Sequence, residues 1–81
     1  MQLILYITDD CSYCEQAITL LGSIGQLSGS TLLTQDIAYD DQLFIQYGEK
    51  IPVLRIGNHE LVWPFTSVEV VNLVQTVASR S

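Results

Sequence analysis

The chain has 81 residues, of which 48% are hydrophobic and 15% charged, the composition of one small folded domain covering residues 1–81 and not of a disordered segment. Its formal net charge of -6 comes from nine acidic and only three basic residues, too few cations to bind nucleic acid or an anionic membrane. No apolar run approaches the roughly 20 residues that cross a bilayer, and the start "MQLILYITDD" is unlike a signal peptide, so we expect a cytoplasmic protein.

The first part of the chain predicts a strand followed by a helix. Residues 2–7 (QLILYI) form a short apolar run, which is typical of a buried strand. A helix is predicted over residues 11–27, because apolar side chains recur at helical spacing on one face: Ala17, Ile18, Leu21 and Ile24. The "SGS" at residues 28–30 ends this helix.

The middle of the chain predicts a second strand, a short helix and a hairpin. Residues 31–37 form the strand, which the preceding helix connects to the first in a right-handed βαβ unit with parallel strands. Residues 40–48 predict a helix that stops at Gly48 and turns inward Leu43, Phe44 and Tyr47. "PVLRI" and "HELVW", joined by Gly57-Asn58, predict a hairpin with a two-residue turn.

The last helix has the clearest start signal. Thr66 and Glu69 match a capping box, and Phe65 with Val70 occupies the positions of a hydrophobic staple. The buried stripe of this helix is predicted to consist of Val70, Val71, Val74 and Val77. The predicted order of elements is therefore βαβαββα.

The two cysteines of the chain, Cys11 and Cys14, stand together at the start of the first predicted helix. A cytosolic C-x-x-C pair in this context is typical of thiol chemistry or of metal binding. The helix start directs unpaired N–H groups and the positive end of the helix dipole at the first sulfur, which favours a nucleophilic thiolate. A zinc site would need four ligands and finds only His59 as a further imidazole, so we expect no metal. A third interpretation is a silent pair on a protein-binding module.

These features together resemble the thioredoxin superfamily, and most of all the glutaredoxins. "CSYC" at residues 11–14 differs by one residue from the glutaredoxin "CPYC", and "KIPVL" at residues 50–54 matches the loop where that family has a cis-proline facing the cysteines. "IPVLRI" with "ELVWPF" is similar to a group of small glutaredoxin-like proteins of unassigned physiological role. The resemblance covers essentially the whole chain and implies a thioredoxin-like α/β fold, with a four-stranded mixed sheet of order 2-1-3-4 and helices on both faces.

The resemblance also implies a function and a set of site residues. It implies a monomeric thiol-disulfide oxidoreductase in which Cys11 attacks and Cys14 resolves, acting on a disulfide-containing protein or a glutathionylated substrate. Tyr13, Ile51 and Pro52 would form the substrate-docking surface, with a cis bond exposing the Ile51 backbone. The alternatives are an ordinary strand-entry proline and a surface tyrosine without a role. The alternative function is a non-catalytic thioredoxin-fold module that binds a specific protein.

The sequence departs from glutaredoxins where they bind glutathione. Thr8 stands where the family has a basic residue, and "LVWPFTS" replaces the Gly-Gly and acidic pattern before the last helix. Lys50 is the one cation close to the proline loop and could compensate in part. We therefore expect weak dependence on glutathione as a co-substrate and no other cofactor. A third possible function is iron–sulfur carriage, since some glutaredoxins bridge a cluster between two subunits with the first cysteine and glutathione; the weak glutathione features count against it.

Two aspartates precede the first cysteine. A carboxylate about 6 Å from the Cys11 sulfur would disfavour the thiolate by about 1 kcal/mol, which is comparable to the opposite effect of the helix start. Alternatively, Asp9 and Asp10 are solvated turn residues. The sequence leaves open which residue is the N-cap of the first helix. Ser12 with Glu15 matches a capping box, but either Asp10 or Cys11 could cap instead.

Overall fold

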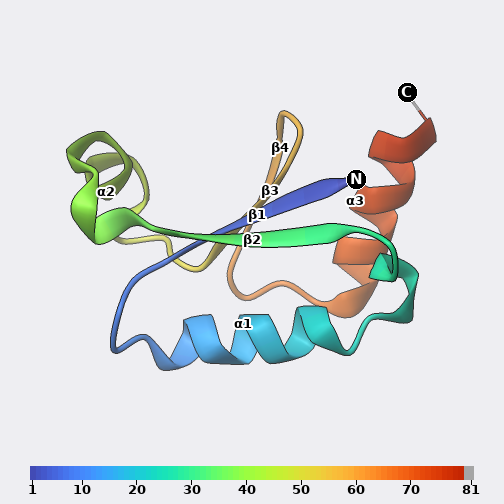
Figure 1. The fold of residues 1–81 in the computed structure, drawn as a ribbon, viewed down its shortest axis with the longest axis horizontal. Coiled ribbons are helices and arrows are strands. Elements are labelled where there is room, and N and C mark those ends of the chain that lie inside the picture. The colour runs from blue at the N-terminus through green and yellow to red at the C-terminus, as the bar shows by residue number, and fades with distance from the viewer. Residues whose placement is uncertain (80–81) are drawn as a thin grey trace.

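A computed structural model describes residues 1–79 and contains the predicted mixture of strands and helices (Figure 1). The helices and strands are, in chain order, β1 (Gln2–Ile7), α1 (Ser12–Gly22), the 3-10 helix η1 (Gly25–Leu27), β2 (Thr31–Asp36), the 3-10 helix η2 (Ile37–Tyr39), α2 (Asp41–Tyr47), β3 (Val53–Ile56), β4 (His59–Val62) and α3 (Ser67–Ser79). No helix within residues 1–79 has the length and apolarity to span a membrane. The predicted order βαβαββα is confirmed, with two short 3-10 helices added.

The four strands form one mixed sheet of order β2-β1-β3-β4, as predicted. β1 pairs with β2 in parallel, and the last pair of this ladder joins Ile7 to Asp36. β3 runs antiparallel to both of its neighbours and forms the predicted hairpin with β4. Gly57 in the hairpin turn has a φ of 61°, the left-handed conformation that glycine adopts without a steric penalty.

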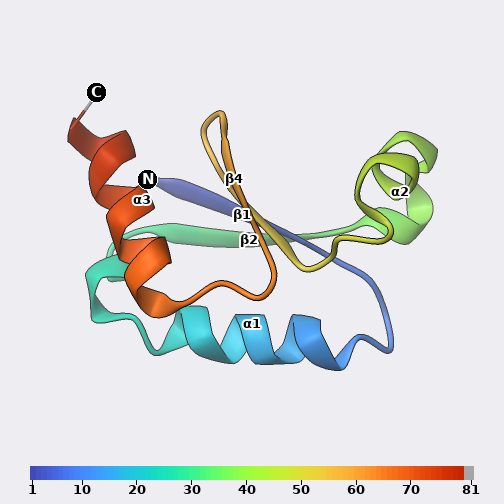
Figure 2. The same cartoon turned by 180° about the vertical axis from the view of Figure 1, so that it is seen from behind.

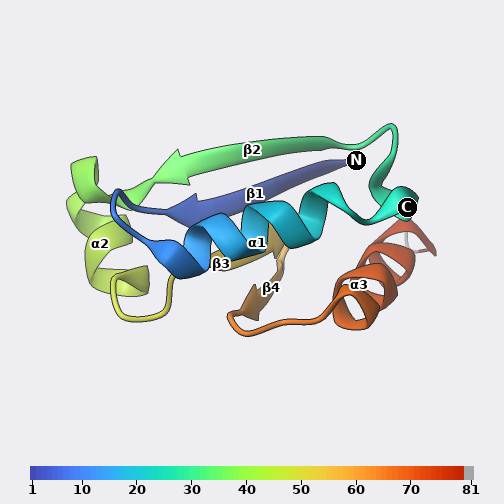
Figure 3. The same cartoon turned by 90° about the horizontal axis from the view of Figure 1, so that it is seen from below.

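Helices cover both faces of this sheet, but unequally. Figure 3 shows α1 lying along one face with α3 beside it, and this layer holds the larger core: Leu3, Leu5, Ala17, Leu21, Ile24, Leu54, Ile56, Phe65 and Val70. Helix α2 covers one end of the other face, over a smaller core of Tyr6, Ile37, Tyr47 and Val53. Figure 2 shows α2 and α3 at opposite ends of the molecule. The far end of the second face therefore has no helix over it in the described part of the chain.

The first helix is shorter than predicted, which corrects the expectation of a helix over residues 11–27. It ends at Gly22, and Ser23 closes it by donating backbone and hydroxyl hydrogen bonds to the carbonyl of Leu20 at 3.1 and 2.7 Å. Glycine and serine are weak helix formers, and the serine hydroxyl competes for the carbonyl groups that would continue the helix. Ile18 is also exposed and not inward, while Leu20 packs against the core instead.

Helix α2 buries a narrower face than predicted. Leu43 and Tyr47 pack against the sheet, but Phe44 is 56% exposed, so its predicted inward orientation is wrong. A helix of two turns presents one row of residues spaced by four to a sheet, and Phe44 falls outside that row. Gly48 ends the helix as predicted, donating its N–H to the carbonyl of Phe44 at 2.8 Å. A Cβ atom at this position would lie 2.5 Å from the same carbonyl oxygen, so the close approach requires glycine.

The start of α3 has the predicted capping box. Thr66 donates its N–H to the carboxylate of Glu69 at 3.1 Å, and the N–H of Glu69 donates to the Thr66 hydroxyl at 3.2 Å. Phe65 and Val70, the predicted staple, are both buried in the larger core. These contacts fix the angle at which α3 leaves the hairpin.

Candidate active site at the start of helix α1

Cys11 is the N-cap residue of α1, which decides between the candidate caps. Its backbone is extended, with φ -113° and ψ 100°, and its Sγ accepts a hydrogen bond from the N–H of Cys14 at 3.1 Å. Ser12 is the first helical residue and forms no capping box with Glu15, whose N–H donates to the Cys11 carbonyl at 3.2 Å. The first cysteine sulfur therefore lies where the unpaired N–H groups of the helix begin.

Cys11 and Cys14 are joined in a disulfide with a Cα–Cα distance of 5.2 Å, within the range that such bonds need. Cys14 is only 3% exposed, whereas Cys11 is partly exposed at the helix start. The pair can thus be bridged without backbone movement, and Cys11 is the more exposed of the two residues.

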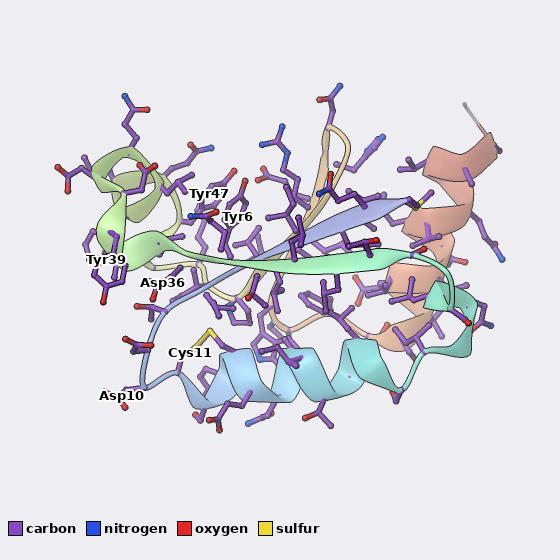
Figure 4. All side chains as sticks on the ribbon, in the orientation of Figure 1. Tyr6, Asp10, Cys11, Asp36, Tyr39 and Tyr47 are labelled. Carbon is purple, nitrogen blue, oxygen red and sulfur yellow. A yellow bond between two sulfur atoms is a disulfide. The ribbon has the colours of Figure 1, made fainter. Side chains whose placement is uncertain are left out.

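The loop before Cys11 turns sharply at Asp10, whose φ of 55° is in the left-handed region. Aspartate tolerates this conformation better than most residues. Asp9 and Asp10 are both exposed, and Figure 4 shows the Asp10 side chain at the outer bend of the loop, pointing away from the Cys11 sulfur. Their effect on the thiolate stays a prediction.

The Ile51–Pro52 bond is cis, as the family resemblance implies, and the Trp63–Pro64 bond is cis as well, which was not foreseen. The pairing of Tyr6 with Val53 places Pro52 beside the end of β1, from which the chain runs directly into Cys11. The proline loop and the disulfide thus lie at the same end of β1.

Hydrogen bonds limit what the proline loop can offer to a substrate. The N–H of Ile51 donates to the Tyr47 carbonyl at 3.1 Å, and the carbonyl of Pro52 accepts from Trp63 at 3.1 Å. The Ile51 carbonyl accepts no hydrogen bond from residues 1–79. The available backbone group is therefore this carbonyl. Tyr13 is 58% exposed and Pro52 is buried, so of the predicted docking residues the first presents its side chain and the second shapes the loop.

A cluster of polar aromatic side chains behind the proline loop was missed by the sequence analysis. The rings of Tyr6 and Tyr47 are stacked with centroids 4.5 Å apart, and the Tyr47 hydroxyl donates to the carboxylate of Glu60. Arg55 donates from Nη1 to the Tyr6 hydroxyl at 3.4 Å. The hydrogen bond to Glu60, together with burial, raises the pKa of Tyr47 to about 12.

The only signal for this cluster in the sequence was the alternation of side chains between the two faces of the hairpin. This alternation puts Arg55 and Glu60 on the sheet face away from α1, and the observed strand register pairs them directly. The participation of Tyr47 depends on how α2 docks, which no local pattern specifies. The cluster anchors the proline loop, because the Tyr47 carbonyl accepts from both Lys50 and Ile51.

Metal ligands do not gather near the cysteines in the described chain. Within residues 1–79, no three His, Cys, Asp or Glu side chains are placed so that they could hold a metal ion.

Comparisons with known proteins agree with this geometry. Residues 2–75 match the family described as Glutaredoxin-like domain (DUF836). The chain is similar to the structural genomics target protein XcR50 from X. campestris: the X-ray structure has 33% identity over 91% of this chain and 96% of that one, with a TM-score of 0.79. The solution structure of XcR50 gives 34% identity over 94% and 95% of the two chains and a TM-score of 0.78.

Thioredoxin 1 from the thermophilic eubacterium Thermosipho africanus shares the fold, with a TM-score of 0.72 and 16% identity over 98% of this chain and 96% of that one. No curated protein matches the chain. The sheet order, the cysteine pair at a helix start and the family match lead to one conclusion: the chain belongs to the glutaredoxin-like domain family (DUF836), with a thioredoxin-like fold.

Proposed function

We propose that the protein is a thiol-disulfide oxidoreductase that uses Cys11 as nucleophile and Cys14 as resolving thiol. The observation that carries this proposal is the hydrogen bond from the Cys14 N–H to the Cys11 sulfur at the start of α1. In the reduced protein the same donor and the helix dipole would stabilise a thiolate, which is the reactive form in disulfide exchange.

The reaction proceeds in two exchanges. The Cys11 thiolate attacks one sulfur of the substrate disulfide, whose second sulfur leaves as a thiolate and takes up a proton. Cys14 then loses its proton and attacks Cys11 in the mixed disulfide, which releases the second substrate thiol. Two electrons pass to the substrate, and the protein forms the Cys11–Cys14 disulfide.

The surface around the sulfurs suggests how a substrate docks. An extended segment could donate an N–H to the Ile51 carbonyl, while the exposed ring of Tyr13 packs against it. Pro52, the next residue of this loop, is buried. Such a surface suits a polypeptide disulfide.

Glutathione is proposed to be a weak co-substrate. Its carboxylates would need donors, but the N–H and hydroxyl of Thr66 at the start of α3 already bond the Glu69 carboxylate, at 3.1 and 3.3 Å. A helix start that is occupied by its own carboxylate has lost part of its attraction for another anion. Thr8, where glutaredoxins have a cation, adds no compensating charge.

The test is reduction of insulin and of a small peptide disulfide, with dithiothreitol as reductant. Cys11→Ser should abolish the catalysed rate, and because serine is a strong N-cap, the variant should keep the fold and the melting temperature of the reduced parent protein. Cys14→Ser should still form the mixed disulfide, but its turnover should be limited to the rate at which dithiothreitol cleaves that mixed disulfide. If the parent protein is no faster than Cys11→Ser with either substrate, the alternative of a non-catalytic interaction module replaces this proposal.

A further inference from the structure

The acidic residues of this chain are concentrated at the end of the molecule that carries the cysteines. Parallel pairing of Ile7 with Asp36 brings the ends of β1 and β2 together, and Figure 1 shows the β1–α1 loop, the start of α1 and α2 at that same end. Of the nine acidic side chains in the sequence, all but Glu60 and Glu69 lie there: Asp9, Asp10, Glu15, Asp36, Asp40, Asp41 and Glu49.

Large exposed apolar side chains share this end. Tyr39 is 87% exposed, and Tyr13 and Phe44 are more than half exposed. Figure 4 shows Asp36 and Tyr39 on the α2 side of the loop that carries Asp10 and Cys11. We call six side chains at this end of the molecule the docking rim; five are exposed and Asp36 is half-buried: Asp9, Asp10, Tyr13, Asp36, Tyr39 and Asp41.

The charge of the docking rim is largely uncompensated by the described cations. Arg55 lies on the sheet, where it bonds the Gly57 carbonyl at 2.9 Å and the Tyr6 hydroxyl. Lys50 is the one described cation at the rim end of the chain. Asp36 is moreover fixed in place, because its carboxylate accepts the N–H of Ala38 at 2.8 Å. The end of the molecule that carries the disulfide therefore has an excess of negative charge and exposed aromatic rings.

We infer that the substrate of this dithiol is a cationic polypeptide, with lysine or arginine residues close to the disulfide that is reduced. This inference rests on the proposed oxidoreductase function and specifies its substrate class. Lysine and arginine complement the rim in two ways: their charges bond carboxylates, and they stack on the faces of tyrosine rings. A one-signed field around a reactive group also raises the encounter rate with the opposite charge by tenfold or more at low salt. The same field repels anionic glutathione.

The experiment uses three peptides with one intramolecular disulfide and the same length, in which the flanking residues are lysine, glutamine or glutamate. The fully reduced protein is mixed with each peptide, and the second-order rate constant of peptide reduction is measured. The protein dithiol supplies both electrons and ends as the Cys11–Cys14 disulfide, so no further reductant is needed. Each rate constant is divided by that for dithiothreitol with the same peptide, which removes differences in intrinsic reactivity.

The expected order is lysine, then glutamine, then glutamate, with at least about a tenfold span at an ionic strength of about 20 mM. At about 500 mM the span should shrink to a few-fold, because salt screens charges in solution. A variant that neutralises three exposed rim carboxylates should lose most of the span at low salt: Asp9→Asn, Asp10→Asn and Asp41→Asn.

The matched control raises the net charge by the same three units at the opposite end, on exposed residues of η1 and α3: Gln26→Lys, Asn72→Lys and Gln75→Lys. It should keep the span of the parent protein. Equal normalised rates with all three peptides, or an equal loss of span in rim variant and control, would overturn the inference while leaving the oxidoreductase function intact. Absence of reaction with every peptide would instead overturn the proposed function, and with it the inference.

Discussion

The hydroxyl group of Tyr47 donates a hydrogen bond to the carboxylate of Glu60, 13 residues further along the chain. This contact ties α2 to β4 at the edge of the sheet, and the stacked ring of Tyr6 supports it from β1. The carbonyl of Tyr47 also accepts the N–H groups of Lys50 and Ile51. One residue therefore connects the helix, the sheet edge and the loop beside the cysteines.

Tyr47→Phe should destabilise the protein by about 1.5–3 kcal/mol, the usual contribution of a hydrogen bond to a charged group. For a domain of this size that lowers the melting temperature by roughly 5–25 °C, measurable by circular dichroism. Tyr39→Phe is the control, since this tyrosine is almost fully exposed, and it should melt like the parent. A Tyr47→Phe variant as stable as Tyr39→Phe would show that the bond to Glu60 contributes nothing.

The raised pKa of Tyr47 predicts a loss of stability at high pH. Its pKa is about 12 in the folded protein, against 10.0 for an ordinary tyrosine, so between these values the unfolded chain gives up the proton and the folded one keeps it. The stabilisation of the folded state by the protonated Tyr47 hydroxyl is complete below pH 10 and disappears as the pH rises through about 12. The free energy of unfolding of the parent, measured in urea, should therefore fall more steeply between pH 10 and 12 than that of Tyr47→Phe. Parallel pH curves for the two proteins would contradict the assignment.

Cys11 should react before Cys14 in the reduced protein, because the second cysteine is almost completely buried. Brief treatment with iodoacetamide followed by peptide mass mapping should find the label on Cys11. A large majority of label on Cys14 would reverse the proposed roles of nucleophile and resolving thiol.

Asp10→Asn should speed this alkylation by up to about fivefold at low salt if the aspartate disfavours the thiolate by about 1 kcal/mol. Asparagine also tolerates the left-handed backbone of this position, so the loop is kept. The control is Gln75→Lys, which raises the net charge equally at an exposed position of α3, at the opposite end of the molecule. The same rate for Asp10→Asn and the parent would identify Asp10 as a solvated bystander, in keeping with its outward direction in Figure 4.

Two glycines should respond oppositely to alanine. A methyl group at Gly48 would lie 2.5 Å from the Phe44 carbonyl oxygen, so Gly48→Ala must displace the end of α2 and should cost about 1–3 kcal/mol. Gly22, at the end of α1, has open space around it, and Gly22→Ala should stabilise the protein by about 0.5–1 kcal/mol through helix propensity. Chemical unfolding of both variants checks the pair, and a shift of the same sign in both would contradict the explanation.

The local features of this protein could be predicted from its sequence. The hairpin at Gly57-Asn58 and the Thr66–Glu69 capping box depend on residues a few positions apart, and both are present as expected. The placement of Cys11 and Cys14 at a helix start follows from a strand, a turn and a helix that are adjacent in the chain. Short-range patterns are sufficient here because the interacting groups meet whenever the local backbone forms.

Only the tertiary structure decided which side chains meet across elements. The outward position of Phe44 and the bond from Tyr47 to Glu60 depend on how a two-turn helix docks, and so few turns hold too little periodicity to define a face. The docking rim likewise gathers residues that are up to 32 positions apart, from Asp9 to Asp41, because β1 and β2 end at the same edge of the sheet. Charge and composition give the number of acidic residues, but packing determines that most of them lie at the end of the molecule that carries the cysteines.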